Sequence, residues 1–107
     1  MDLITKAIKA LEQVNITDFQ AYDLESTNPF YNYVIVASGT KRQSSSVLGH
    51  LKEELKNAYE VRSIEGKGSG WLLIDLGNLI VHIFDRDTKE YYKFDERFIN
   101  VKELKLD

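Results

Sequence analysis

The sequence predicts an α/β fold in which a mixed β-sheet of about five strands is flanked by helices. Two segments place apolar residues at helical spacing, and five shorter segments have the composition or the flanking turn residues of strands. The helical segments are residues 2–14 and 41–59, and the strand segments are 19–24, 31–38, 60–65, 71–76 and 79–84. This order of elements is typical of α/β domains. With 107 residues, of which 43% are hydrophobic, we expect a single domain over residues 1–107.

The first helix is predicted by apolar residues that recur every three or four positions, with charged residues filling the other side. Asn15 favours a break directly after it. Two strands follow, separated by the turn-forming residues 26–29. Residues 34–37 are continuously apolar, which is typical of a central strand that is covered on both faces.

The second helix is predicted to begin after Gly39, because Thr40 and Gln43 have the spacing of a capping box. Its apolar positions extend the prediction to Tyr59. Residues 60–65 are a short strand candidate, and the glycine-rich residues 66–70 are expected to form a flexible loop that leads into a strand.

A β-hairpin is the strongest local signal. The runs WLLIDL and LIVHIF are separated only by Gly77-Asn78, and glycine at the first turn position is typical of a type II′ turn. With these two residues in the turn, Trp71 lies opposite Phe84 and Leu73 lies opposite His82.

The two faces of this hairpin differ in composition. One face is wholly aliphatic, and the other carries Trp71, Leu73, Asp75, Ile80, His82 and Phe84. Two readings of the mixed face stay open. In one, helices cover it and Asp75 orients a partly buried His82. In the other, part of it near Trp71 stays exposed as a docking surface, since aromatic anchors with polar rims are what protein interfaces use.

The C-terminal residues 86–107 are evenly charged with interspersed aromatic residues, and we expect a short helical turn and an irregular tail. Tyr91, Tyr92 and Phe94 must be buried somewhere, so pairing of two copies as a homodimer is a further possibility.

The composition argues against most catalytic and metal-binding chemistry. The absence of cysteine excludes a disulfide framework and a thiolate zinc site, and fits a cytoplasmic location. His50 and His82 have no paired ligand spacing, so no metal is expected. No G-x-S-x-G sequence surrounds residues 44–46, which argues against a serine nucleophile. We therefore expect no enzyme activity and no cofactor.

Net charge and hydropathy limit the partners. The chain carries 14 basic and 17 acidic residues, a net charge of −3, and no segment is strongly basic. We expect no direct sequence-specific binding of nucleic acid, and contact with RNA only through a protein. No apolar run reaches membrane-spanning length, and the N-terminus lacks the continuous apolar core of a signal peptide.

One function that the sequence leaves open, as an alternative to a non-enzymatic role, is that of a nucleotide-binding or nucleotidyltransferase-like enzyme. Asp85 and Asp87 have the carboxylate spacing that two-metal nucleotidyl transfer uses, although such residues after a strand are commonly solvated. The glycine-rich residues 66–70 lack phosphate-loop spacing. Lys41 and Arg42 at the start of the second helix could touch a phosphate backbone, but basic residues are common there.

Several motifs in order closely resemble the ribosomal silencing factor family, also called Iojap-like, over nearly the whole chain. The motifs are 32–39, Thr40-Lys41-Arg42-Gln43, Glu65-Gly66, Gly70-Trp71, Asp75, 79–84 and Tyr91-Tyr92. The closing segment departs from the family pattern, because Phe98-Ile99 stands where the family has a terminal tryptophan.

The resemblance implies a nucleotidyltransferase-like topology without that fold's catalytic carboxylates. It further implies that the protein binds the large ribosomal subunit at its protein fourteen, sterically blocks joining with the small subunit, and represses translation under nutrient limitation. By the family pattern, the partner-binding residues are Glu65, Trp71, Leu72, Asp75, His82 and Tyr92.

Overall fold

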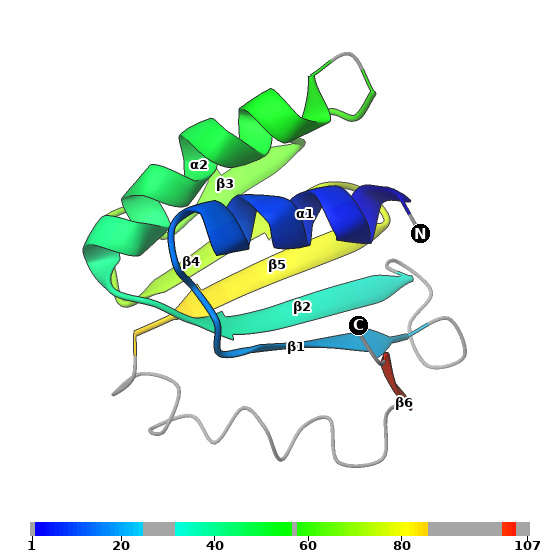
Figure 1. Cartoon of the computed structure of the whole chain (residues 1–107), viewed down its shortest axis with the longest axis horizontal. Helices are drawn as coiled ribbons and strands as arrows, with labels where there is room; N and C mark the ends of the chain where they lie inside the picture. Colours follow the sequence, from blue (N-terminus) through cyan, green and yellow to red (C-terminus); the bar gives the residue numbers. More distant parts are fainter. Residues whose placement is uncertain (1, 25–31, 57, 86–101, 105–107) are drawn as a thin grey trace.

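A computed structural model of the chain describes residues 2–24, 32–56, 58–85 and 102–104. Within these residues, two helices pack against a six-stranded mixed sheet (Figure 1). The elements are α1 Asp2–Gln13, β1 Phe19–Asp23, β2 Tyr33–Ser38, α2 Lys41–Leu55, β3 Ser63–Glu65, β4 Trp71–Asp75, β5 Leu79–Phe84 and β6 Lys102–Leu104. The strand order is β3-β4-β5-β2-β1-β6, in which only the β2–β5 pair is parallel. The predicted α/β class and mixed sheet are confirmed, with one strand more than expected.

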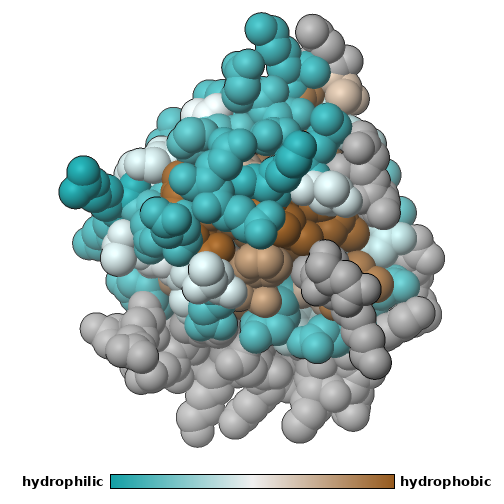
Figure 2. All heavy atoms as spheres, in the orientation of Figure 1, coloured by the Kyte–Doolittle hydropathy of each residue, from teal (hydrophilic) through white to brown (hydrophobic). Residues whose placement is uncertain are grey.

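Both helices lie on the same face of the sheet. Apolar residues of α1 and α2 form one buried cluster with alternate residues of the strands, including Ile35, Ile74 and Val81. In Figure 2, hydrophilic residues cover the outer surface of the helical layer, and hydrophobic residues show in a band where this layer meets the sheet. Among the described residues, neither helix is long and apolar enough to cross a membrane.

Helix α1 ends where the sequence predicts, through a left-handed residue. Asn15 has φ 63°, and its backbone N–H donates to Glu12 O at 3.0 Å. The N–H of Ile16 donates to Leu11 O, also at 3.0 Å. This pair of bonds is a Schellman motif, which satisfies carbonyls at the helix end and folds Ile16 onto the core.

Helix α2 begins with the predicted capping box but ends earlier than expected. Thr40 Oγ1 accepts from Gln43 N at 3.1 Å, and Gln43 Oε1 accepts from Thr40 N at 2.9 Å. The predicted end near residue 59 is wrong, because Lys56 leaves helical geometry with ψ 129°. Tyr59, counted as an apolar helix position from the sequence, is 38% exposed.

The predicted hairpin register is confirmed. Trp71 pairs with Phe84, Leu73 with His82 and Asp75 with Ile80. Gly77 has φ 90°, so the first turn position uses the freedom that favours glycine. The aliphatic face of the hairpin belongs to the core under α1 and α2.

The glycine-rich segment leads into β4, as predicted, and residues 66–69 form a tight turn in which Ser69 N and Ser69 Oγ both donate to Gly66 O, at 3.0 Å and 2.7 Å. The expectation of an irregular tail needs correction. Residues 102–104 form edge strand β6 against β1 rather than irregular tail. The predicted turn at 26–29 and the predicted helical turn in 86–101 lie outside the described residues.

The turn before β4 gives a prediction about Gly66. Gly66 has φ +82°, and an added Cβ would meet the backbone oxygen of Trp71 at 2.0 Å. An alanine at this position is strained by the positive φ angle, and the backbone oxygen of Trp71 cannot move aside to relieve the clash. We therefore expect Gly66→Ala to lower the free energy of unfolding by about 3 kcal/mol. Denaturant titration measures this loss.

Gly68 provides the matched control. It also has positive φ, +78°, but a Cβ there would meet nothing within 4 Å. Gly68→Ala should therefore lower the free energy of unfolding by only about 1 kcal/mol, the cost of placing a non-glycine residue at positive φ. Equal losses in the two variants would contradict the close approach at Gly66.

Candidate functional site

The candidate site lies on the sheet face that points away from α1 and α2. The cross-strand register places Glu65 beside Leu73, and Leu73 beside His82, on this face. We call it the opposite face; its residues on β3, β4 and β5 are Ser63, Glu65, Trp71, Leu73, Asp75, Ile80, His82 and Phe84. Of the two readings of the mixed hairpin face, the one in which helices cover it does not hold for α1 and α2, because both pack on the aliphatic face.

A second apolar cluster forms the base of the opposite face. Phe84, Val36 and Ile80 are buried in it, and half-buried Trp71 and Leu73 pack against it. The burial of residues 34–37 on both sheet faces confirms that β2 is a central strand. The half-buried Trp71 and Leu73 therefore rest on a buried apolar base.

Trp71 is fixed through its ring. Its indole Nε1–H donates to His82 Nδ1 at 3.0 Å. The ring centroid lies 5.0 Å from that of Phe84 and 5.9 Å from that of His82. Because His82 Nδ1 accepts this bond, the imidazole proton is assigned to Nε2 and the ring is neutral in this arrangement. The indole is thus held in one orientation, and Trp71 stays half-buried at the edge of the second apolar cluster.

Ser69 fixes the backbone of the same residue. Ser69 Oγ accepts from Trp71 N at 3.2 Å. Its single proton, which donates to Gly66 O, also lies within reach of Trp71 O, 3.0 Å from the hydroxyl oxygen. Sequence reasoning did not single out Ser69. The available signal was a serine two residues before the strand's first residue, since such hydroxyls bond to nearby backbone groups.

Asp75 plays a different part from the one expected. Its Oδ1 accepts from Gly77 N at 2.8 Å and so stabilises the hairpin turn. Within the described residues, the His82 ring accepts a hydrogen bond from Trp71. Trp71, rather than Asp75, therefore orients the ring. The register makes both residues diagonal neighbours of His82, which lies opposite Leu73. The longer indole of Trp71 reaches the ring, whereas the Asp75 carboxylate bonds to the turn.

The structure brings together four of the six residues that the sequence singles out. Glu65, Trp71, Asp75 and His82 lie on the opposite face, Glu65 being exposed and the others half-buried. Leu72 points to the other side of the sheet and is only 2% exposed, so it can position its neighbours but offers almost no contact surface. Tyr92 lies outside the described residues.

The described residues show no assembled metal site. No group of three or more histidines or carboxylates gathers within the part of the chain that the structure describes. Asp85 follows β5, with its backbone N–H donating to Gly70 O at 2.8 Å, and Asp87 lies outside the described residues. Residues 44–46 lie on α2, on the other side of the sheet from His82. The arrangement on the opposite face is suited to contact rather than to nucleophilic chemistry.

Comparison with known proteins gives consistent relatives. The ribosomal silencing factor of Haemophilus influenzae is 32% identical over 90% of this chain and 97% of its own length. That of Bacillus subtilis is 27% identical over 84% of this chain and 79% of its own. A mouse protein named for mitochondrial assembly of the ribosomal large subunit is 24% identical over 87% of this chain but only 43% of its own. The bacterial names describe a regulatory role rather than an enzyme.

Solved structures confirm the fold. A crystal structure from Bacillus halodurans superposes with a TM-score of 0.82 at 22% identity, covering 97% of each chain. One from Chromobacterium violaceum gives 0.81 at 26% identity, covering 89% of this chain and 82% of its own. The nucleotidyltransferase-like label for this topology stays a prediction.

The family model described as "Ribosomal silencing factor during starvation" matches residues 1–106. This match spans the elements that carry Glu65, Trp71, Asp75 and His82. The chain therefore belongs to the ribosomal silencing factor family.

Proposed function

We propose that this protein binds the large ribosomal subunit at its protein fourteen and thereby blocks joining with the small subunit. The observation that carries the proposal is the fixed, half-buried Trp71 beside His82 on the opposite face, which also carries Glu65 and Asp75. Its membership of the silencing family and the mouse relative's name support a ribosomal partner. Repression of translation then follows from steric exclusion, in the cytoplasm, and needs no catalysis or cofactor.

The opposite face has the features of a protein-docking surface. Trp71 is held through both its ring and its backbone, so little side-chain entropy is lost when a partner covers it. Glu65 and Asp75 add negative charge on the same face, which suits a partner that lies amid ribosomal RNA and is expected to be basic. The positioning role of Leu72 is indirect, since its side chain packs on the helical side.

Sedimentation tests the proposed mechanism. Purified protein is mixed with large subunits, small subunits are added at joining-permissive magnesium, and the mixture is resolved on a sucrose gradient. We expect the protein to migrate with large subunits and the peak of joined ribosomes to fall. Protein that stays at the top of the gradient, with joining unchanged, would contradict the proposal.

Trp71→Ala tests the anchor. Removing a fixed aromatic anchor should cost about 2 kcal/mol of binding free energy, a loss of roughly thirtyfold in affinity for large subunits. Trp71→Phe keeps an aromatic ring but removes the N–H that His82 accepts, so its affinity should fall between those of the wild type and Trp71→Ala. Binding is measured by titrating large subunits against labelled protein.

Tyr59→Ala is the matched control for this pair. It also removes an aromatic side chain that solvent reaches, but one beyond the end of α2. Circular dichroism confirms that each variant is folded before binding is compared. If folded Trp71→Ala binds as well as Tyr59→Ala, Trp71 is not the anchor.

The negative charge of the chain and of the opposite face predicts how affinity for large subunits depends on salt. Because the chain carries a net charge of −3 and Glu65 lies on the proposed contact face, affinity for large subunits should fall as salt rises. Glu65→Gln should reduce this salt dependence. Glu53→Gln makes the same charge change on α2 and should leave the slope nearly unchanged. Equal slopes for the two variants would place the contact elsewhere.

We also propose that two copies can pair as a homodimer. Sedimentation equilibrium of the free protein tests the pairing, and a dimer that dissociates when large subunits are added would mean that the two contacts overlap.

A further inference from the structure

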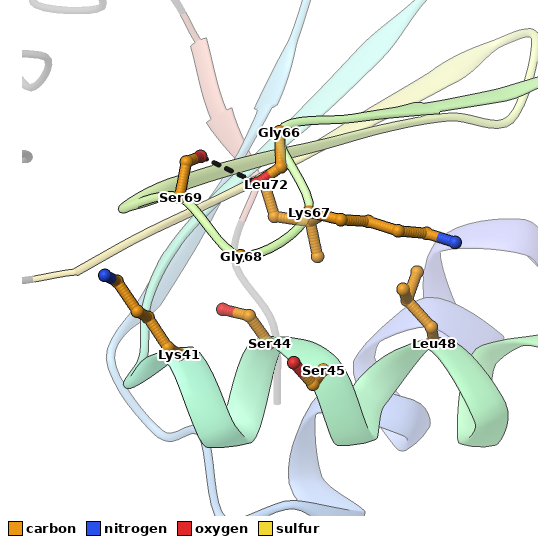
Figure 3. A pocket seen from close by; sticks show the side chains of 9 residues that line it. All are labelled: Lys41, Ser44, Ser45, Leu48, Gly66, Lys67, Gly68, Ser69 and Leu72. Carbon is orange, nitrogen blue, oxygen red and sulfur yellow. Dashed lines mark hydrogen bonds between the residues drawn. The ribbon is translucent and has the colours of Figure 1, made fainter.

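A pocket of about 250 Å³ lies between the N-terminal half of α2 and the turn that precedes β4 (Figure 3). The lining residues are Lys41, Ser44, Ser45, Leu48, Gly66, Lys67, Gly68, Ser69 and Leu72. Leu72 and Leu48 belong to or pack on the core under the helices, so the pocket is on the helical side of the sheet. It is therefore separate from the opposite face that carries Trp71 and His82.

Two sequence features that looked unrelated form the walls of this pocket. The basic start of α2 supplies one side, and the glycine-rich turn supplies the other. In Figure 3, Ser44 and Ser45 face the turn from α2, while the ammonium groups of Lys41 and Lys67 lie toward opposite ends of the pocket. The tight turn makes this wall a fixed one, because Ser69 bonds to Gly66 O.

The lining is positive although the whole chain is acidic. It contains two lysines and no aspartate or glutamate, whereas the chain's net charge is −3. Glu65, next to the turn, lies beside Leu73 and so points to the other side of the sheet. Among the described residues, Lys41 and Lys67 have no ion pair or hydrogen bond that would satisfy their ammonium groups.

Hydroxyl groups complete the polar lining. Ser44 and Ser45 have no side-chain hydrogen bond with other described residues, so both hydroxyls can donate to a ligand. Ammonium groups and hydroxyl donors together are the groups that bind phosphate oxygens. A volume of about 250 Å³ equals about eight water molecules at about 30 Å³ each, enough for a diphosphate group.

We propose that this pocket binds the phosphate or diphosphate group of a small phosphorylated molecule, held between Lys41 and Lys67. The serine hydroxyls donate to its oxygens, and Leu48 and Leu72 form the apolar floor. Typical sites for drug-sized ligands begin near about 300 Å³, so any nucleoside attached to the phosphates extends outside the pocket. This inference goes beyond the proposed ribosomal function and does not depend on it.

Binding here has an intrinsic reporter. Trp71 is the only tryptophan in the chain, and its backbone N–H is held by Ser69, which lines the pocket. A ligand that contacts the turn at residues 66–69 therefore perturbs the backbone of Trp71 directly. We expect a saturable change in tryptophan fluorescence when pyrophosphate is titrated into the isolated protein.

The test compares charge-removing variants at matched positions. Isothermal titration with pyrophosphate should show one site per chain, and Lys41→Gln combined with Lys67→Gln should weaken binding by about tenfold or more. Lys9→Gln combined with Lys52→Gln removes the same charge from exposed positions outside the lining and should weaken it by less than about twofold. The four substituted lysines lie on the helices or in the turn, and their side chains form no hydrogen bond or ion pair with other described residues.

Further ligands identify the source of the phosphate. Tighter binding of a nucleoside diphosphate than of pyrophosphate would assign the site to a nucleotide, and equal binding would assign it to the diphosphate group alone. Absence of saturable binding, equal weakening in both pairs of variants, or binding of an RNA oligonucleotide without binding of pyrophosphate would overturn the proposal. None of these outcomes bears on the proposed ribosomal function, because the experiment contains no ribosomes.

Discussion

The packing of both helices on one face of the sheet is the constraint on which the rest of the structure depends. Alternate residues of β4 and β5 on that face are wholly aliphatic and complete the core with α1 and α2. Their neighbours along each strand must then point to the opposite face. Trp71, Asp75 and His82 lie on that face because Leu72, Ile74 and Val81 are needed in the core. The location of the candidate docking surface is therefore a consequence of the core.

Residues 66–72 connect the two sides of the molecule. Gly66 lies so close to the backbone of Trp71 that no side chain fits there, and Ser69 bonds to both Gly66 and Trp71. The ring of Trp71 rests on the apolar base of the opposite face, while Leu72 lines the pocket on the helical side. A change in the turn is thus transmitted through adjacent backbone atoms to the proposed anchor, over one or two residues rather than through a long network.

Local sequence signals predicted much of this arrangement. Gly77-Asn78 placed the hairpin turn, and the turn determined every pair from Trp71–Phe84 to Asp75–Ile80. Thr40 and Gln43 predicted the start of α2 because capping is a short-range interaction. What could not be predicted depends on tertiary packing: the face that both helices choose, the three-residue edge strand β6, and the pocket that joins α2 to the turn at residues 66–69. The partner of His82 was missed because a longer indole reaches it diagonally from Trp71.

The central claim is that the opposite face, with Trp71 at the start of β4 as its anchor, is the surface that meets the large ribosomal subunit. Hydroxyl-radical footprinting of the protein, free and bound to large subunits, tests this most directly, since oxidation is read residue by residue. The account predicts that oxidation of Trp71 falls several-fold on binding, while exposed His50 on α2 and Tyr59 beyond it are oxidised as in the free protein. Protection of His50 and Tyr59 with unchanged oxidation of Trp71 would contradict it.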